Sequence, residues 1–375
     1  MTINTRSIVI AVVLIAAGFA TPATSAQGTK SEGKAAAHSD SGYSTVKITP
    51  IGQRTGELCR RDVALLFEDP SGVRILYDPG LTIRGGNDPR LGTVDVILVS
   101  HNHYDHVGSR RLLQDPDDAN SSCAQQPLTT KTPYTVTAEI AAAKNSAVLV
   151  GLGMETFLRN KISQLNASAG DPCYDFDPSG PLNELVVPRS APCTGHLGVG
   201  TYRIVTRASG EPGVRIALVP AQHVDNIYQY FFLTEPLASY MSDNQLTTYS
   251  GLAHGYVLNF TNGLRAYLSG DTGPTAEMAV MRDFYDPNLA VLNIDSVSTM
   301  GPEEAAFAVK RLIKPAAVIA SHAGEQVTQG GQLLPGTQIA QFIALVPETP
   351  VYLPLSGRTM EFDGNAQCVA GCGKN

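Results

Sequence analysis

The chain has 375 residues, of which 43% are hydrophobic and 16% are charged, a composition typical of a globular protein with a large core. The length fits one large domain or two halves that pack as one. The formal net charge is −7. We therefore expect no nucleic-acid partner and no binding to an anionic membrane surface, because both attract basic proteins.

The N-terminus has the pattern of an export signal. Arg6 precedes the apolar run Ile8–Ala20, and small residues follow at 21–26. This order predicts a signal peptide over residues 1–26, and hence a periplasmic or secreted protein. The apolar run is shorter than the ~20 residues of a membrane-spanning helix, so no stable membrane span is expected. Residues 27–42 are small and polar, which predicts a flexible linker.

From Tyr43 onward, short β-branched runs bounded by Gly, Pro or Asp recur, and they predict strands. The predicted strands are Thr45–Ile51, Asp62–Phe67, Val73–Tyr77, Val94–Val99, Ala147–Val150, Tyr202–Thr206, Val214–Val219, Tyr256–Phe260, Arg265–Ser269, Ala290–Ile294, Ala317–Ala320 and Val351–Leu355. Helices are predicted over 137–144, 154–165, 302–313 and 336–345. Alternating strands and helices indicate an α/β fold with two sheets covered by outer helices.

Two long stretches, 114–133 and 167–200, are rich in Pro, Gly, Asp, Asn and Ser and are interpreted as insertions. The six cysteines are an even number, which favours disulfides in an exported protein over buried free thiols; they are Cys59, Cys123, Cys173, Cys193, Cys368 and Cys372. Cys173 and Cys193 bracket one insertion and are the pair we expect first. We also predict a disulfide between the two cysteines of the tail. The proposed organisation is a catalytic domain over 43–363 and a C-terminal tail over 364–375.

Three of the eight histidines crowd into residues 100–106, Ser-His-Asn-His-Tyr-Asp-His, directly after an apolar strand. In an extended segment His101 and His103 point the same way, so both can bind one ion. Asp105 and His106 follow at a predicted turn into a helix. Imidazole and carboxylate groups are zinc-type ligands, so this spacing predicts a metal site rather than a solvated polar loop.

Three further ligand-type residues stand at or just beyond the ends of apolar strands: His223, Asp271 and His322. Functional residues gather at this position in layered α/β folds, because the carboxyl ends of the strands meet at one edge. One such residue alone could be a loop cap or a core histidine. Three together predict a second group of metal ligands.

The order His101-X-His103-X-Asp105-His106, then His223, Asp271 and His322, resembles the metallo-β-lactamase superfamily. The resemblance covers about residues 45 to 362 and implies a four-layer αββα sandwich. Within that superfamily the segments 100–106, 268–273 and 300–306 are similar to the branch of ascorbate-phosphate lactonase and N-acylphosphatidylethanolamine phospholipase D.

The resemblance implies two divalent metal ions; we expect Zn²⁺, with Mn²⁺ or Fe²⁺ as alternatives. His101, His103 and His223 would hold the first ion, and Asp105, His106 and His322 the second, with Asp271 bridging both. The implied reaction is hydrolysis of an ester, lactone or phosphodiester bond by a metal-bridging hydroxide. Asp105 would act as the catalytic residue that orients this nucleophile or accepts its proton.

The contacts to substrate are less specific. Asp295 is interpreted as a loop cap and His254 as a structural residue, with substrate binding as the alternative for each. Residues 224–250 hold six aromatic side chains, Tyr228 and Tyr230 among them. They either contact an apolar or lipid-like small-molecule substrate or pack against a sheet. Alternative functions are a mononuclear iron oxidoreductase of the sulfur dioxygenase type, a β-lactamase and a non-catalytic metal-binding protein. The complete ligand set favours the dinuclear hydrolase.

Overall fold

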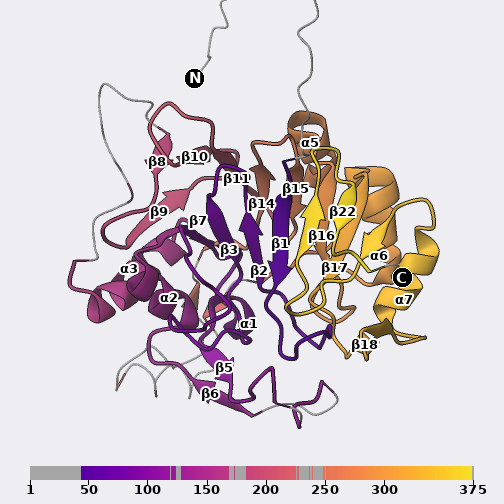
Figure 1. The fold of residues 1–375 in the computed structure, drawn as a ribbon, viewed down its shortest axis with the longest axis horizontal. Helices are drawn as coiled ribbons and strands as arrows, with labels where there is room; N and C mark the ends of the chain where they lie inside the picture. The colour runs from indigo at the N-terminus through magenta and orange to yellow at the C-terminus, as the bar shows by residue number, and fades with distance from the viewer. Residues whose placement is uncertain are drawn as a thin grey trace, which may run out of the picture. The chain divides into compact units, whose positions relative to one another are not determined.

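A computed structural model describes residues 44–118, 120–123, 128–168, 173, 183–224, 226–227, 236, 239, 248–249 and 251–373. The predicted signal peptide and linker lie outside these residues. Within the described ranges, the central feature is a pair of eight-stranded sheets, both drawn in Figure 1. All described residues belong to one compact unit that spans Tyr43–Asn375.

The first sheet combines a parallel half and an antiparallel half. In spatial order its strands are β22 (Cys368–Ala370), β21 (Met360–Phe362), β1 (Val46–Pro50), β2 (Leu65–Glu68), β3 (Arg74–Tyr77), β4 (Val96–Leu98), β7 (Ala147–Gly151) and β9 (Cys193–Leu197). The neighbours β3, β4, β7 and β9 are parallel, so their carboxyl ends meet at one edge.

The second sheet has the same mixed character. In spatial order its strands are β20 (Val351–Tyr352), β17 (Ala317–Ser321), β16 (Leu289–Asn293), β15 (Arg265–Leu268), β14 (His254–Asn259), β11 (Val214–Pro220), β10 (Tyr202–Thr206) and β8 (Glu184–Val186). Strands β15, β16, β17 and β20 are parallel neighbours. Three two-stranded ribbons complete the described strands: β5 (Arg110–Leu112) with β6 (Thr129–Lys131), β12 (Asn226–Ile227) with β13 (Thr248–Tyr249), and β18 (Thr328–Gln329) with β19 (Gln332–Leu333).

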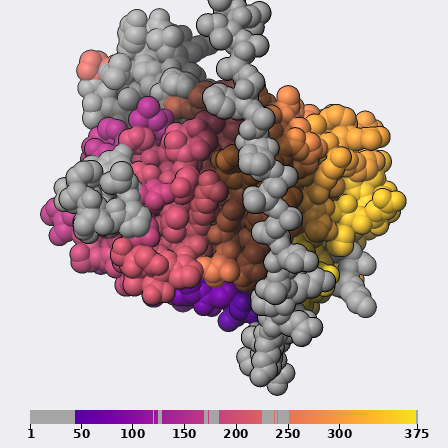
Figure 2. All heavy atoms as spheres, turned by 90° about the horizontal axis from the view of Figure 1, so that it is seen from above, coloured from indigo at the N-terminus to yellow at the C-terminus, as the bar shows by residue number. Residues whose placement is uncertain are grey.

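Helices cover the outer face of each sheet, which gives the predicted αββα sandwich (Figure 1). The first sheet carries α1 (Tyr104–Val107), α2 (Val136–Lys144) and α3 (Met154–Leu165); the second carries α5 (Glu277–Tyr285), α6 (Pro302–Phe307), its π-helical continuation η2 (Ala308–Ile313) and α7 (Gln338–Leu345). Seen from above, surface residues from the middle of the chain lie on one side of the molecule, and those from its last part lie on the other side (Figure 2).

The apolar runs of the strands follow from this layering. In β4, Val96 and Leu98 face the core between the sheets, whereas Ile97 packs against the helices of the first sheet. In β15, Leu268 faces the same central core and Tyr267 the opposite helical layer. Strands buried on both faces read as continuous apolar segments, which is why the sequence shows runs rather than alternation.

The structure differs from the sequence-based expectation in its domain boundaries, in helix α5 and in ten of the described strands, which were not predicted. The stretch 167–200 is not wholly an insertion, because β8 and β9 lie in it and form one edge of each sheet. The stretch 364–375 is not a separate tail, because β22 pairs with β21. Helix α5 was not predicted. The predicted helices α2, α3 and α7 and the helix beginning at Pro302 are confirmed to within two residues at their boundaries.

Three disulfides join the cysteines of the described chain in pairs. Cys173–Cys193 and the pair Cys368–Cys372 confirm the two predicted bonds, and Cys59–Cys123 is the third. Among the described residues, no helix is both long and apolar enough to span a membrane.

Candidate metal centre

The histidine-rich segment, residues 100–106, follows strand β4 at the edge of the first sheet. His101 and His103 lie in the loop that follows β4, and α1 then places Asp105 and His106 beside them. The rings of His101 and His106 are 4.1 Å apart between centroids. This tight return of the chain needs glycine at position 80, because a Cβ there would stand 2.3 Å from the carbonyl oxygen of Asp105.

The second sheet supplies the other three ligand-type residues from separate strands. His223 comes three residues after β11 ends at Pro220, Asp271 three residues after β15 ends, and His322 directly after β17. His322 adopts a positive φ of 50°, which is uncommon for a residue other than glycine. Its backbone N–H donates to the carbonyl of Asp62 at 3.0 Å, a bond that helps to hold this conformation.

The seven predicted ligands form two groups. One comprises His101, His103, His223 and Asp271, and the other Asp105, His106 and His322. Within each group, one ligand atom from every residue lies within 4.8 Å of those of the others. In the first group His223 Nε2 and His103 Nδ1 approach to 3.1 Å. These are the two groups that the sequence resemblance implies.

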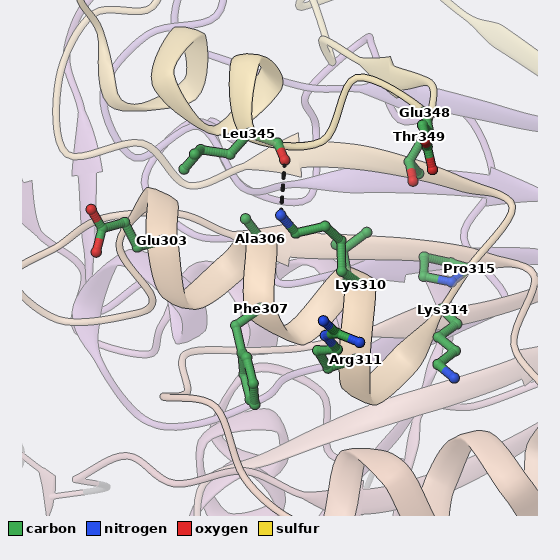
Figure 3. A pocket seen from close by; sticks show the side chains of 11 residues that line it. Glu303, Ala306, Phe307, Lys310, Arg311, Lys314, Pro315, Leu345, Glu348 and Thr349 are labelled. Atoms are coloured by element: carbon green, nitrogen blue, oxygen red, sulfur yellow. Dashed lines mark hydrogen bonds between the residues drawn. The ribbon is translucent and has the colours of Figure 1, made fainter.

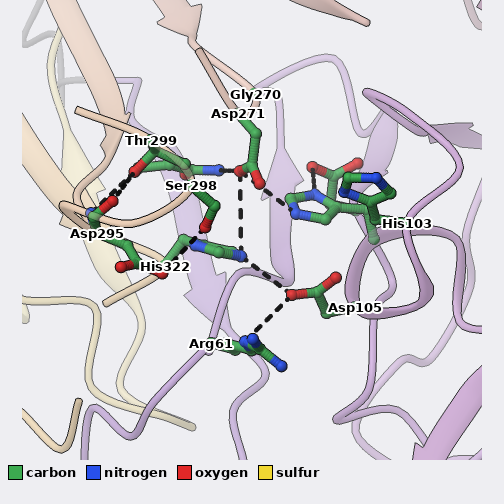
Figure 4. Close-up of polar contacts among 12 residues, drawn as sticks. Arg61, His103, Asp105, Gly270, Asp271, Asp295, Ser298, Thr299 and His322 are labelled. Carbon is green, nitrogen blue, oxygen red and sulfur yellow. Dashed lines mark hydrogen bonds and ion pairs between the residues drawn. The ribbon is translucent and has the colours of Figure 1, made fainter. Parts of the chain in front are cut away.

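Asp271 stands between the two groups, one carboxylate oxygen toward each (Figure 4). Its Oδ2 is 3.8 Å from His101 Nε2 and 3.7 Å from His223 Nε2. Its Oδ1 is 3.4 Å from His106 Nε2 and 4.0 Å from His322 Nε2. Asn293, at the end of β16, donates to Oδ1 at 2.8 Å and so fixes the orientation of the carboxylate. This is the arrangement expected of a bridging ligand.

Buried nitrogens without hydrogen-bond partners provide an independent test of whether metal fits here. The Nε2 atoms of His101 and His106 are buried and make no hydrogen bond to any residue that the structure describes. Such atoms are costly to bury unless a ligand satisfies them. Burial also lowers the pKa of His101, and it lowers the pKa of His103 to about 4. Both imidazoles are therefore neutral near pH 7, the form that binds metal.

Asp78 orients His106 from behind. Its Oδ2 is 2.8 Å from His106 Nδ1 and accepts a hydrogen bond from Ser100 Oγ at 2.8 Å, while Oδ1 accepts from the Ser100 backbone N–H at 2.7 Å. Burial opposes protonation of His106, but Asp271 and Asp78 outweigh it and raise its pKa. A carboxylate on Nδ1 leaves Nε2 directed at the metal position, the usual support of a ligating histidine. The sequence reasoning missed Asp78.

Arg61 is a second residue that the sequence reasoning missed. Its Nε lies 3.5 Å from Asp105 Oδ2, and the same oxygen lies 3.3 Å from His322 Nε2 (Figure 4). The guanidinium also stacks on the Tyr104 ring, 5.3 Å from its centroid. Arg61 thus holds the carboxylate of Asp105 on the side of the second ligand group. It belongs to no recognisable motif.

Asp295 makes the contacts expected of a loop cap. Its Oδ1 accepts from the Val297 backbone N–H at 3.1 Å and its Oδ2 from Ser298 Oγ at 3.1 Å, so the side chain closes its own loop. The aromatic candidates Tyr228 and Tyr230 lie outside the described residues.

The expected structural role of His254 is also supported, because both of its ring nitrogens have partners. Nδ1 is 3.0 Å from the Leu252 carbonyl and Nε2 is 2.9 Å from the hydroxyl of Tyr256. That hydroxyl in turn contacts the carbonyls of Val99 and Leu149. His254 therefore ties β14 to the ends of β4 and β7, and burial lowers its pKa.

A groove of about 700 Å³ lies between η2 and α7 (Figure 3). Lys310 crosses it and donates from Nζ to the Leu345 carbonyl at 3.2 Å. Its walls mix basic side chains such as Arg311 and Lys314 with the acids Glu303 and Glu348. Its described lining includes none of the seven predicted metal ligands, so the groove is not a candidate for the catalytic site.

Comparisons with known proteins agree with the ligand pattern. The Beta-lactamase superfamily domain matches residues 62–170, a range that contains the histidine-rich segment. A UPF0173 metal-dependent hydrolase of Cupriavidus taiwanensis is 27% identical over 279 residues, which cover 73% of this chain and 76% of that protein. One from Myxococcus xanthus is 27% identical over 307 residues, covering 80% of this chain and 79% of the relative.

Among solved structures, the metallo hydrolase Igni18 of Ignicoccus hospitalis aligns with 85% of this chain and 99% of its own length, at 20% identity and a TM-score of 0.49. The narrower resemblance to the lactonase and phospholipase D branch stays a prediction. The matched domain, the similarity to metal-dependent hydrolases and the two ligand groups joined by Asp271 support a metallo-β-lactamase superfamily hydrolase.

Proposed function

We propose that the protein is an exported hydrolase that holds two divalent metal ions and cleaves an ester, lactone or phosphodiester bond in a small-molecule or lipid-like substrate. The position of Asp271 carries the proposal, because its two oxygens face two separate groups of ligands. The relatives described as metal-dependent hydrolases support it. Imidazole and carboxylate ligands favour zinc, with Mn²⁺ or Fe²⁺ as alternatives.

The two ions would supply Lewis acidity and a water molecule whose pKa is lowered towards neutrality. The chain's own groups set the geometry. Asp271 spans the two positions, and Asp78 holds His106 in the required orientation. Burial opposes a lowered pKa at Asp105, but the hydrogen bond from His322 and the charge of protonated His106 outweigh it; bound metal ions would supply this positive charge in place of the proton. Asp105 is thus ionised and able to orient the attacking water or accept its proton.

Export is part of the proposal. It rests on the predicted signal peptide over residues 1–26 and is supported by the pairing of all six cysteines, since disulfides persist in oxidising compartments. N-terminal sequencing of the protein recovered from the periplasm or medium should begin near Gln27. A sequence that begins at Met1 would exclude cleavage.

The central experiment combines metal analysis with hydrolysis assays. The purified protein should contain two metal ions per chain and hydrolyse at least one of bis-p-nitrophenyl phosphate, an acyl lactone or a cephalosporin, with loss of activity in chelator. Asp271→Asn should lower both metal content and turnover. Asp295→Asn, a buried aspartate that closes a neighbouring loop, is the matched control and should keep two ions. Turnover that survives complete metal removal would refute the mechanism.

A further inference from the structure

An apolar pocket of about 400 Å³ opens among the ends of β7, β9 and β11 and the start of β14. The described lining residues are mostly glycine and aliphatic, and none of them carries a charged side chain; they include Gly151, Leu152, Leu197, Val199, Leu252 and His254. The volume lies within the ~300–1,000 Å³ of small-molecule sites. Neither the hydrolytic centre nor the loops already described account for it.

The pocket adjoins the metal centre on two sides. In the first sheet, Leu98 of β4 pairs with Leu149 of β7, so Gly151 stands level with Ser100, the residue before His101. In the second sheet, His254 pairs with Pro220, three residues before His223. The backbone N–H of His254 donates to the Ser100 carbonyl at 3.1 Å, which joins the two sides. The lining residue His254 is therefore joined through Ser100 to the segment that carries His101.

The pocket is lined mainly by carbon atoms. His254 uses both nitrogens within the protein and turns its Cε1 toward Gly151, where a Cβ would stand only 2.9 Å away. At the rim, Leu152, Val199 and Leu252 are 69%, 53% and 68% exposed. Large aliphatic side chains left in water around a cavity mark a binding site more often than a free surface.

We propose that this pocket binds the hydrophobic chain or ring of the substrate, beside the bond that is cleaved. The inference rests on the proposed hydrolase function and specifies its substrate class: an ester, lactone or phosphodiester that carries an alkyl, acyl or aryl group. The link of its lining through His254 and Ser100 to the histidine-rich segment distinguishes this pocket from the charged groove between η2 and α7 (Figure 3). A group seated here would lie beside the strands that lead to His101 and His223.

A series of p-nitrophenyl esters of increasing acyl length tests the inference with the metal-loaded protein. Each methylene buried in the pocket should raise kcat/KM about fourfold, equivalent to ~0.8 kcal/mol, until the pocket is full. Leu252→Asp and Val199→Asp should flatten this dependence while metal content stays at the wild-type level. Val280→Asp is the matched control, since Val280 is also 68% exposed but lies on α5, and it should keep the wild-type slope.

A binding measurement on the metal-free protein separates the two proposals. The probe 1-anilinonaphthalene-8-sulfonate should bind with increased fluorescence, be displaced by 1-octanol, and bind at least tenfold more weakly to Leu252→Asp. Failure to hydrolyse any ester, with this binding intact, would count against the hydrolase function alone. Turnover that does not depend on chain length, or a slope that Leu252→Asp leaves unchanged, would overturn the pocket assignment. A change from dimer to monomer in that variant, with an unchanged slope, would assign the pocket to self-association.

Discussion

Asp78→Asn isolates the support of one metal ligand without touching the ligand itself. Asp78 accepts three hydrogen bonds, from the Ser100 backbone N–H, Ser100 Oγ and His106 Nδ1, all between 2.7 and 2.8 Å. Its φ of 41° is a conformation that asparagine also tolerates, so the backbone should not move. The substitution removes the negative charge that holds the proton on His106 Nδ1 and keeps Nε2 available.

Loss of such a supporting carboxylate typically weakens metal binding by about 10- to 100-fold, or ~1.4–2.7 kcal/mol. Because His106 lies in the group with Asp105 and His322, the second ion should be the one affected. Competition with a chromogenic chelator should show one affinity lowered within this range and the other nearly unchanged. Hydrolysis should recover when the metal concentration is raised above the new dissociation constant.

Asp69→Asn is the matched control. Asp69 is also buried and accepts three hydrogen bonds, from Ser71 N, Thr261 N and Thr261 Oγ1, but it lies in a turn after β2 away from the ligands. It should lower thermal stability without changing either metal affinity. Equal metal affinities in Asp78→Asn and the wild type would refute the role assigned to Asp78, as would equal losses in both variants.

Three further substitutions test other residues. Arg61→Ala should weaken the second metal site about fivefold or less, the range of a partly exposed ion pair, in the same chelator titration. Burial raises the pKa of the Asp62 carboxyl to about 7. Protonated Asp62 therefore contributes its full stabilisation below its unfolded pKa, near 4, and this stabilisation is lost as the pH rises through 7. Asp62→Asn should flatten the dependence of Tm on pH across this window. His254→Ala should lower Tm but leave metal content at two ions per chain.

The two groups of metal-type side chains could be predicted to lie together because metal binding requires a fixed pattern. His101 and His103 must be two apart on an extended segment, and the remaining ligands must lie where strands end. The same reasoning would have identified Asp78, which directly follows the predicted strand Val73–Tyr77. It escaped notice because an aspartate before proline is also an ordinary turn residue.

The missed strands have a different cause. Strand β9, Cys193–Leu197, contains glycine and histidine, and β8 has only three residues, so neither shows a β-branched run. Their positions depend on pairing with β7 and β10, which lie elsewhere along the sequence. Tertiary pairing overrides weak local preference in such segments. The long apolar strands, which pack on both faces, carry their own signal.

Arg61 shows why part of a site is beyond local sequence reasoning. Its loop is fixed at both ends by distant contacts: Cys59 is bonded to Cys123 in the 114–133 insertion, and the Asp62 carbonyl accepts from His322 N. The Asp62 carboxylate closes the loop through the backbone N–H groups of Gln53 and Cys59. The disulfide thus joins the insertion to the loop that carries Arg61, although its two cysteines are 64 residues apart in sequence. A residue placed by such remote contacts has no spacing that the sequence alone could reveal.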